Sequence, residues 1–202
     1  MEMSSGSSLR DRKKRAVRDA AADAALTLFA AQGYDATTVS EIAARAGMSP
    51  RTFFRYFSGK DELITHTFAA IGEDVVTALS RRPPQEGPWM AVRRAFDPLI
   101  EQLERDERGL VIMRIIYDTP VLYAKHLEKQ TRWRLGIAAV LLERVRSGSG
   151  SMTEWGQLEA EALAGAAISC LEAARSAWAS GAGTASPGNL LDVAMAAVSP
   201  LD

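Results

Sequence analysis

The sequence predicts an all-α protein of about nine helices. Apolar residues recur at intervals of three and four along most of the chain, which is the spacing of one helix face. Glycines, prolines and Ser/Thr capping residues stand where these periodic segments begin and end. No stretch combines strand-like alternation with turn residues at its ends. These three observations argue against a β-sheet.

The first predicted helix begins near Arg12, after a Ser/Gly-rich segment, residues 1–8, that we expect to be disordered. Gly33 ends it, because glycine adopts the left-handed backbone conformation at little cost. Its apolar face is spaced by four, three and four residues: Val17, Ala21, Ala24 and Leu28.

Three further helices follow in quick succession. Thr38 and Glu41 have the spacing of a capping box, which begins a short second helix that Gly47 ends. Ser49 and Pro50 begin a third helix that runs to about Tyr56, since proline suits the first helical position. A long fourth helix is predicted over 58–81 and is ended by two prolines at 83 and 84.

The rest of the chain is predicted to be helical throughout. Proline-start signals recur at 118–120 and 186–187. Pro98 should kink or split its helix, and the Ser/Gly run 147–151 is predicted to be a flexible connector. The predicted segments are 88–106, 108–117, 120–147, 153–180 and 187–198.

Composition excludes several classes of protein. One cysteine, Cys170, and two histidines, His66 and His126, rule out a disulfide framework and leave too few ligands for a multi-thiolate or histidine-rich metal site, so we expect no metal and no cofactor. The longest apolar run, 135–142, falls short of the ~20 residues that a membrane span needs. The first thirty residues carry charges where a secretory signal needs an apolar core. We expect a cytoplasmic protein.

The net charge of −1 hides an asymmetry between two predicted domains. Residues 1–60 carry ten Lys/Arg and six Asp/Glu, whereas residues 61–202 carry fourteen and nineteen. Much of the excess lies near the N-terminus, in a segment that includes Arg12, Lys13 and Lys14. A solvated helix start accounts for these charges, and so does a basic arm that binds phosphates.

Residues 38–57 have the layout of a helix-turn-helix, in which a second short helix can enter the major groove of DNA. Its outward face would present Pro50, Arg51, Thr52, Phe54 and Arg55. Its interior would be Ile42, Ala43, Ala46, Met48, Phe53 and Phe57. Helical hairpins are common, so this layout alone does not establish DNA binding.

The residues themselves are more specific. The run TVSEIAARAGMSPRTFFRYFSGKDEL, from Thr38 to Leu63, resembles the DNA-binding signature of TetR-family transcriptional regulators. Upstream, Leu28-Phe29 and Gly33-Tyr34 are similar to the end of that family's first helix. The resemblance implies a three-helix DNA-binding domain over 1–60 and a larger helical domain over 61–202 for ligand binding and dimerisation.

The resemblance also implies roles for individual residues. Backbone phosphates would be held by Thr38, Tyr56 and Lys60, with Arg12, Lys13 and Lys14 reaching a neighbouring backbone or the minor groove. Base reading would fall to Arg51, helped by Pro50, Thr52, Phe54 and Arg55. Position 51 is often glycine in the family and position 54 often tyrosine, so the operator should differ from the family average.

Family members bind small molecules among their middle helices, where this chain has many aromatic and apolar residues. A pocket of that kind is mostly apolar with few polar groups. His126 also fits an ordinary structural role. The candidate effector contacts are Trp89, Phe96, Met113, Arg114, Tyr117, Tyr123, His126 and Trp133. An acyl-CoA-like effector and a planar hydrophobic drug or metabolite both suit this set.

The predicted helix 153–180 is rich in small residues that allow close helix approach, such as Ala160, Ala164, Gly165 and Ala167. Such a helix serves either as a core helix or as a dimer interface, and the resemblance implies a homodimer through the last two long helices. The function so implied is that of a homodimeric repressor that binds a palindromic double-stranded DNA operator and leaves it on binding a small molecule. The alternatives are a helical enzyme, for which no catalytic set is present, and a constitutive DNA-binding or adaptor protein with a solid interior.

Overall fold

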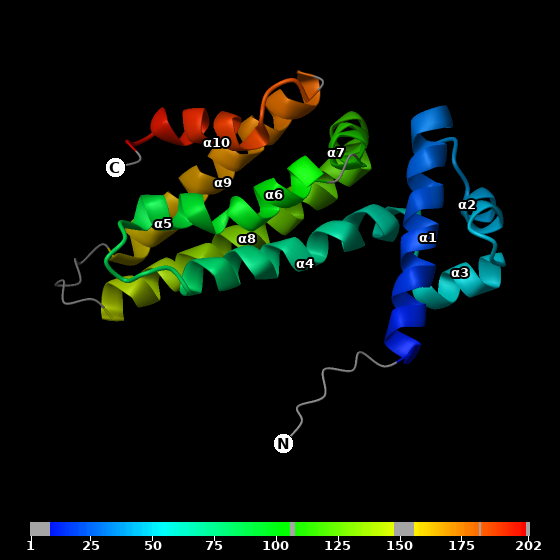
Figure 1. Cartoon of the computed structure of the whole chain (residues 1–202), viewed down its shortest axis with the longest axis horizontal. Coiled ribbons are helices and arrows are strands. Elements are labelled where there is room, and N and C mark those ends of the chain that lie inside the picture. Colours follow the sequence, from blue (N-terminus) through cyan, green and yellow to red (C-terminus); the bar gives the residue numbers. More distant parts are fainter. Residues whose placement is uncertain (1–8, 106–107, 148–155, 182, 201–202) are drawn as a thin grey trace. The chain divides into compact units, whose positions relative to one another are not determined.

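The computed structural model describes residues 9–105, 108–147, 156–181 and 183–200, which contain ten helices and no strand (Figure 1). The all-α prediction is confirmed. The expected disorder over 1–8, the connector after residue 147 and the first residues of the helix predicted over 153–180 lie outside the described residues. The helices are α1 (Leu9–Gln32), α2 (Val39–Arg45), α3 (Pro50–Tyr56), α4 (Lys60–Ser80), α5 (Pro88–Ala95), α6 (Asp97–Arg105), α7 (Arg108–Asp118), α8 (Pro120–Ser147), α9 (Gly156–Ser180) and α10 (Pro187–Ala196).

The chain forms two compact units, Met1–Thr67 and Phe68–Asp202, whereas the sequence analysis placed the domain boundary after residue 60. The division falls inside α4 because the first turns of that helix pack with the N-terminal unit. Leu63, in the first turn of α4, is buried.

The N-terminal unit has a small aromatic and aliphatic core. α2 packs against both α1 and α3. Small residues line the contact, since Ala21 and Ala25 of α1 and Ala43 of α2 are fully buried and allow the helix axes to approach closely. Larger side chains fill the rest of this core. Each one that is fully buried contributes about 1.5–3 kcal/mol to the stability of the fold. They are Phe29, Tyr34, Ile42, Phe53 and Phe57.

The C-terminal unit is built around α9, which contacts α8, α10, α7 and α5. Its buried residues are mostly small, among them Ala164, Ala167 and Ala174, with Leu171 and Trp178 as larger members. α9 is therefore a core helix of its own subunit along much of its length. Ion pairs of Arg93 connect α5 to two neighbouring helices. Arg93 pairs with Asp192 of α10 and, at 2.6 Å, with Asp97 of α6.

The segment predicted as one helix over 88–106 is two helices, which raises the number from about nine to ten among the described residues. Pro98 lacks the amide that would continue the helix, and its ring clashes with the preceding turn. α5 accordingly ends at Ala95 with Phe96 as its C-cap. Pro98 then lies in the first turn of α6, where a missing amide costs nothing.

The loop between α4 and α5 is held by one side chain of α8. Arg144 donates hydrogen bonds to the carbonyl oxygens of Arg82 at 2.8 Å, Pro83 at 2.7 Å and Glu86 at 3.0 Å. The guanidinium therefore pairs loop carbonyls that have no strand or helix partner. None of the helices in the described part of the chain is long and apolar enough to cross a membrane.

Candidate functional site

The start of α2 is fixed by a capping box. The Thr38 hydroxyl accepts a hydrogen bond from the Glu41 amide at 3.2 Å, and the Thr38 amide donates to the Glu41 carboxylate at 2.7 Å. The backbone and hydroxyl hydrogen bonds from Thr38 lower the pKa of Glu41. Because Glu41 already occupies the Thr38 amide and hydroxyl, a DNA phosphate would have to compete with this carboxylate at Thr38.

The turn between α2 and α3 is a Schellman motif. Gly47 has a φ of +67°, its amide donates to the Ala44 carbonyl at 3.1 Å, and the Met48 amide donates to the Ala43 carbonyl at 2.9 Å. Ser49 then caps α3 by accepting from the Thr52 amide at 3.1 Å. Backbone hydrogen bonds and caps therefore fix the direction in which α3 begins.

The two sides of α3 have different tasks. Phe53 and Phe57 face inward, with ring centroids 5.0 Å apart, and both are buried. Phe54 faces outward with 58% of its surface exposed, although it is a large aromatic residue. Arg51 and Arg55 are exposed beside it. An exposed aromatic side chain between two arginines on a rigid helix can contact both phosphates and base edges.

Two of the other residues predicted on the outward face of α3, Thr52 and Arg55, already make intramolecular contacts. The Thr52 hydroxyl lies 3.0 Å from that of Ser49, so it belongs to the cap. The Arg55 guanidinium lies over the Tyr56 ring, 5.1 Å from its centroid. Pro50 is exposed at the first helical position. Arg51 makes no hydrogen bond or ion pair with the residues that the structure describes, and its donors are available to a ligand.

Lys60 has an intramolecular role that the sequence analysis did not foresee. Its ammonium group donates to the carbonyl oxygens of Tyr34 at 2.6 Å, Thr37 at 2.9 Å and Asp35 at 3.4 Å. It also lies 4.2 Å from the centroid of the Tyr34 ring. These three acceptors match the three donors of an ammonium group, so Lys60 holds the α1–α2 loop and has no donor left for a phosphate.

The basic residues near the N-terminus form part of a helix. Arg12, Lys13 and Lys14 lie in the first turns of α1 and are exposed. The helix predicted from about Arg12 begins at Leu9, so this basic segment is the start of α1. These side chains offer positive charge along one helix.

A cluster of polar and aromatic side chains lies inside the C-terminal unit. The rings of Tyr117, Tyr123 and His126 are neighbours, with centroids 5.8–6.3 Å apart. His126 Nε2 lies 2.9 Å from a carboxylate oxygen of Glu172 on α9. Gln130 also donates to Glu172. Burial raises the pKa of Glu172. The hydrogen bond and charge of His126, with the hydrogen bonds of Gln130 and Tyr117, lower this pKa by more than burial raises it, so the net shift is downward.

A buried arginine lies in the same region. Arg175 of α9 is 1% exposed, and its guanidinium carbon lies 5.3 Å from the centroid of the Trp133 ring. Burial lowers the pKa of Arg175 to about 10, an effect opposed by Tyr117 and Glu172. The group remains charged at neutral pH.

Two family models match the chain, one after the other. The model for bacterial regulatory proteins of the tetR family matches residues 22–67, and the model for the MftR C-terminal domain matches residues 86–201. The chain belongs to the TetR family. Proteins of this family are transcriptional regulators that bind DNA, and the curated relatives carry names of regulators and not of enzymes.

Curated relatives and solved structures agree with this assignment. The transcriptional regulator TcmR of Streptomyces glaucescens is 36% identical over 146 residues, which is 69% of this chain and 65% of that protein. The putative mycofactocin biosynthesis regulator MftR of Mycobacterium tuberculosis is 30% identical over 153 residues, 74% of this chain and 75% of that one.

Two solved structures share the TetR-family fold at low identity. SmeT of Stenotrophomonas maltophilia, in a complex with triclosan, has a TM-score of 0.66 at 20% identity, and the match covers 90% of this chain and 91% of that chain. FadR of Bacillus subtilis, in complex with stearoyl-CoA, has a TM-score of 0.64 at 18% identity, covering 90% of this chain and 98% of that chain.

The structure brings together only part of the predicted effector set of this TetR-family chain. Tyr117, Tyr123 and His126 form one group, and Trp133 reaches it through Arg175. Trp89 donates its indole N–H to the Ser199 carbonyl at 3.1 Å, and Arg114, an exposed residue, donates to the Ala179 carbonyl at 3.1 Å. Phe96 and Met113 are fully buried core residues.

Sequence reasoning missed the polar residues that complete the group. Gln130, Glu172 and Arg175 were not among the predicted contacts, because the small residues dominate the sequence pattern of α9. The signal was present, because Glu172 and Arg175 are charges three residues apart on a helix that is otherwise apolar at those turns. Charges on an apolar helix face indicate partners or ligands.

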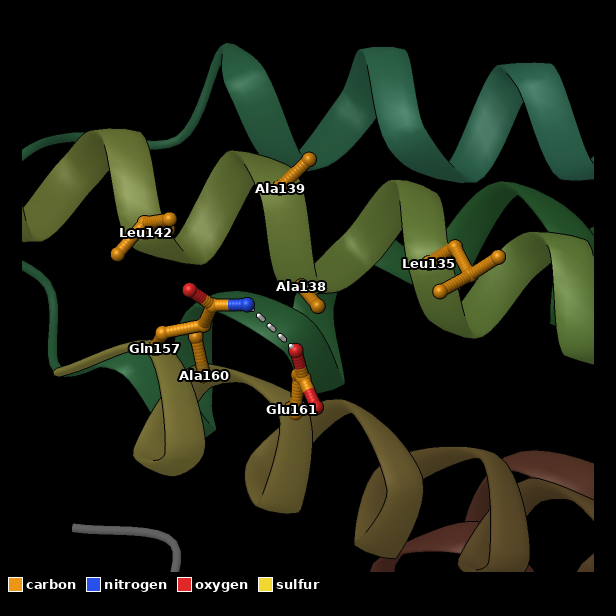
Figure 2. A pocket seen from close by; sticks show the side chains of 7 residues that line it. All are labelled: Leu135, Ala138, Ala139, Leu142, Gln157, Ala160 and Glu161. Carbon is orange, nitrogen blue, oxygen red and sulfur yellow. Dashed lines mark hydrogen bonds between the residues drawn. The ribbon is translucent and has the colours of Figure 1, made fainter. Parts of the chain in front are cut away.

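The outer side of α8 and α9 carries exposed apolar residues. Leu127 and Leu135 of α8 and Leu158 of α9 are exposed, Leu135 by 57%. Figure 2 shows the groove beside Leu135, where Gln157 and Glu161 of α9 are joined by a hydrogen bond of 3.0 Å. α9 thus has a buried side and a side with apolar surface in contact with solvent.

Proposed function

We propose that this TetR-family regulator is a repressor that binds a palindromic operator as a homodimer and is released by a small hydrophobic or amphipathic effector. The observation that carries the proposal is the outward side of α3. Arg51, Phe54 and Arg55 are exposed there, while the caps and the buried phenylalanines fix the helix. The protein acts in the cytoplasm, where a bacterial chromosome lies.

Base reading falls first to Arg51. An arginine can donate two hydrogen bonds to guanine O6 and N7, and such a pair discriminates by about 1–3 kcal/mol. Phe54 supplies an apolar surface for a thymine methyl group, and Pro50 and Thr52 border the same face. Arg55, whose guanidinium lies over the Tyr56 ring, would contact the DNA backbone beside the groove.

Phosphate contacts come from other residues. Arg55 and Tyr56 are the last two residues of α3, and Arg12, Lys13 and Lys14 add positive charge on α1. Thr38 stays a predicted phosphate contact that would need Glu41 to yield its place. Lys60 is left out, because its donors already bind the α1–α2 loop.

The dimer forms through the outer side of α8 and α9. One short recognition helix offers too little interface for a tight specific complex, and a twofold dimer presents two such helices about one DNA turn apart. The exposed leucines at 127, 135 and 158 supply apolar area for a self-complementary interface. A second copy of this chain is the occupant that a symmetric arrangement requires.

Effector control requires that the two DNA-binding units change their spacing. α4 belongs to both compact units, since the division of the chain falls within it. We infer that an effector bound in the C-terminal unit shifts α4 and so disfavours the spacing that fits the operator. The effector then weakens DNA binding only by as much as it prefers the other spacing.

The test is a footprint followed by a binding titration. DNA that flanks the gene is searched for a palindrome, and protection of that palindrome identifies the operator. Arg51→Ala should weaken operator binding by about 5- to 150-fold and relax the preference at one base pair per half-site. Arg105→Ala, which removes an exposed arginine of the other unit, is the matched control. Equal affinities for wild type and Arg51→Ala would contradict the assignment of α3.

A further inference from the structure

The interior of the C-terminal unit contains polar atoms without hydrogen-bond partners. They are all three nitrogens of the Arg175 guanidinium. More than 90% of buried polar groups in native proteins are paired, so three such atoms on one buried side chain call for a specific explanation, and a bound ligand is one. Leaving Arg175 unpaired is costly, because it is charged and almost completely buried.

The neighbouring groups of the same unit do not satisfy the hydrogen-bond donors of the buried Arg175 guanidinium. Its guanidinium makes no hydrogen bond with the described residues. Glu172 influences it through its charge, but a Glu172 oxygen is already bound by His126 and Gln130. The guanidinium charge of Arg175 therefore has no hydrogen-bonded carboxylate among the described residues.

Aromatic rings surround this charge. Trp133 lies against the Arg175 guanidinium, and the Tyr117 ring packs with those of Tyr123 and His126. Such rings bind flat apolar molecules through stacked and edge-to-face contacts. A planar guanidinium binds a carboxylate through two parallel hydrogen bonds, which gives direction as well as affinity.

We propose that Arg175 binds the anionic oxygen group of an aromatic effector whose rings lie against Trp133 and Tyr117. The proposal rests on the effector-controlled function argued above and gives the chemical class of the effector. An aromatic acid supplies one negative charge to one buried guanidinium. An acyl-CoA carries several phosphate charges, which exceed what this site pairs, and it becomes an outcome of the test.

The experiment uses the full-length protein and two matched probes, 2-naphthoate and the uncharged 2-naphthamide, with palmitate and palmitoyl-CoA as further arms. Calorimetry measures affinity, and thermal unfolding without any probe measures stability. Arg175→Met removes the charge and keeps apolar volume. Arg175→Lys keeps the charge and loses the planar fork. Arg146→Met is the control, since Arg146 is an exposed arginine of the same unit that belongs to no predicted contact set.

We expect wild type to bind 2-naphthoate at least about tenfold more tightly than 2-naphthamide, a ratio that corresponds to about 1.4 kcal/mol. Arg175→Met abolishes this preference, Arg175→Lys reduces it, and Arg146→Met preserves it. Without probe, Arg175→Met keeps or raises the Tm, because an unpaired buried charge destabilises the fold.

Several results would overturn the proposal. They are equal binding of the two probes by wild type, a preserved preference in Arg175→Met, and a lower Tm of that variant, which assigns Arg175 a structural role. Tighter binding of palmitate or palmitoyl-CoA than of 2-naphthoate would exclude the aromatic class. Operator binding by wild type is measured in parallel. If it is intact while no anion is preferred, this inference alone fails and the proposed function stands.

Discussion

The ammonium group of Lys60 lies 2.6 Å from the carbonyl oxygen of Tyr34, 26 residues earlier in the chain. This contact joins the first turn of α4 to the loop between α1 and α2 and thereby closes the N-terminal unit around its aromatic core. A residue of the recognition motif that resembles a phosphate contact is in this structure an internal tie.

Lys60→Met is expected to destabilise the N-terminal unit. Charge-assisted hydrogen bonds to backbone carbonyls contribute about 1.5–3 kcal/mol, and their loss leaves the α1–α2 loop carbonyls without these partners. Urea unfolding should show a lower midpoint for this variant. Affinity for all DNA sequences should fall with it, while the dependence of affinity on salt stays the same.

Lys13→Met is the matched comparison, because Lys13 is an exposed lysine of α1. Its removal should leave stability unchanged and reduce the salt slope by about one unit, as the loss of one phosphate contact does. The reverse pattern, with a flatter salt slope for Lys60→Met at unchanged stability, would restore the phosphate role of Lys60.

Local structural roles could be predicted from the sequence, whereas contacts between distant residues could not. Thr38, Gly47 and Ser49 were predicted correctly as caps and stops, because each acts on backbone groups within a few residues. Pro98 split its helix for an equally local reason. Lys60 and Tyr34, or His126 and Glu172, are joined across 26 and 46 residues. No local rule specifies such pairs, so the tie at Lys60 and the polar cluster at Glu172 and Arg175 became visible only in three dimensions.

Gly47→Ala is expected to cost about 1–2 kcal/mol of stability, because an L-residue is strained at a φ of +67°. A Cβ at this position meets no atom within 4 Å, so the cost comes from the backbone alone. Gly87 has equally open surroundings but a φ of −54°. Gly87→Ala should therefore stay within about 0.5 kcal/mol of wild type in the same urea titration.

A smaller loss for Gly47→Ala than for Gly87→Ala would show that the Schellman turn does not limit stability. DNA binding gives a second readout for Gly47→Ala, since α3 depends on this turn for its direction. We expect operator affinity to fall more than affinity for unrelated DNA.

Leu135→Glu is expected to dissociate the proposed dimer while leaving the fold of the subunit intact. Leu135 is 57% exposed in the subunit, so a charge there is solvated in the monomer. An unpaired carboxylate in a closed apolar interface costs about 3 kcal/mol or more, which weakens association over a hundredfold. Sedimentation velocity measures this change directly.

Val193→Glu is the control for the interface, because Val193 is a still more exposed aliphatic residue on α10, at 70%. We expect it to remain dimeric. Dissociation by Val193→Glu with a dimeric Leu135→Glu would move the interface from α8 and α9 to α10.

Arg144→Met should destabilise the C-terminal unit by about 2–3 kcal/mol, since three carbonyls of the α4–α5 loop lose the guanidinium and only that of Pro83 keeps a backbone donor, the Glu86 amide. Arg146→Met, two residues later and exposed, should change the free energy of unfolding by less than about 0.5 kcal/mol. Thermal unfolding followed by circular dichroism compares the two variants. Equal Tm values would mean that solvent replaces Arg144 at the loop without cost.

The residues that hold α3 are largely distinct from those on its outward face. Gly47, Ser49, Phe53 and Phe57 hold the helix, whereas the outward Arg51 makes no hydrogen bond or ion pair with the described residues. Thr52 shares the cap of Ser49, and Phe54 packs edge-on against Phe53. Within the seven residues of α3, the side chains proposed to read the operator are therefore largely different from those that hold the helix in place. Exchange of the outward residues alone should redirect this regulator to a new promoter while its effector response is inherited unchanged.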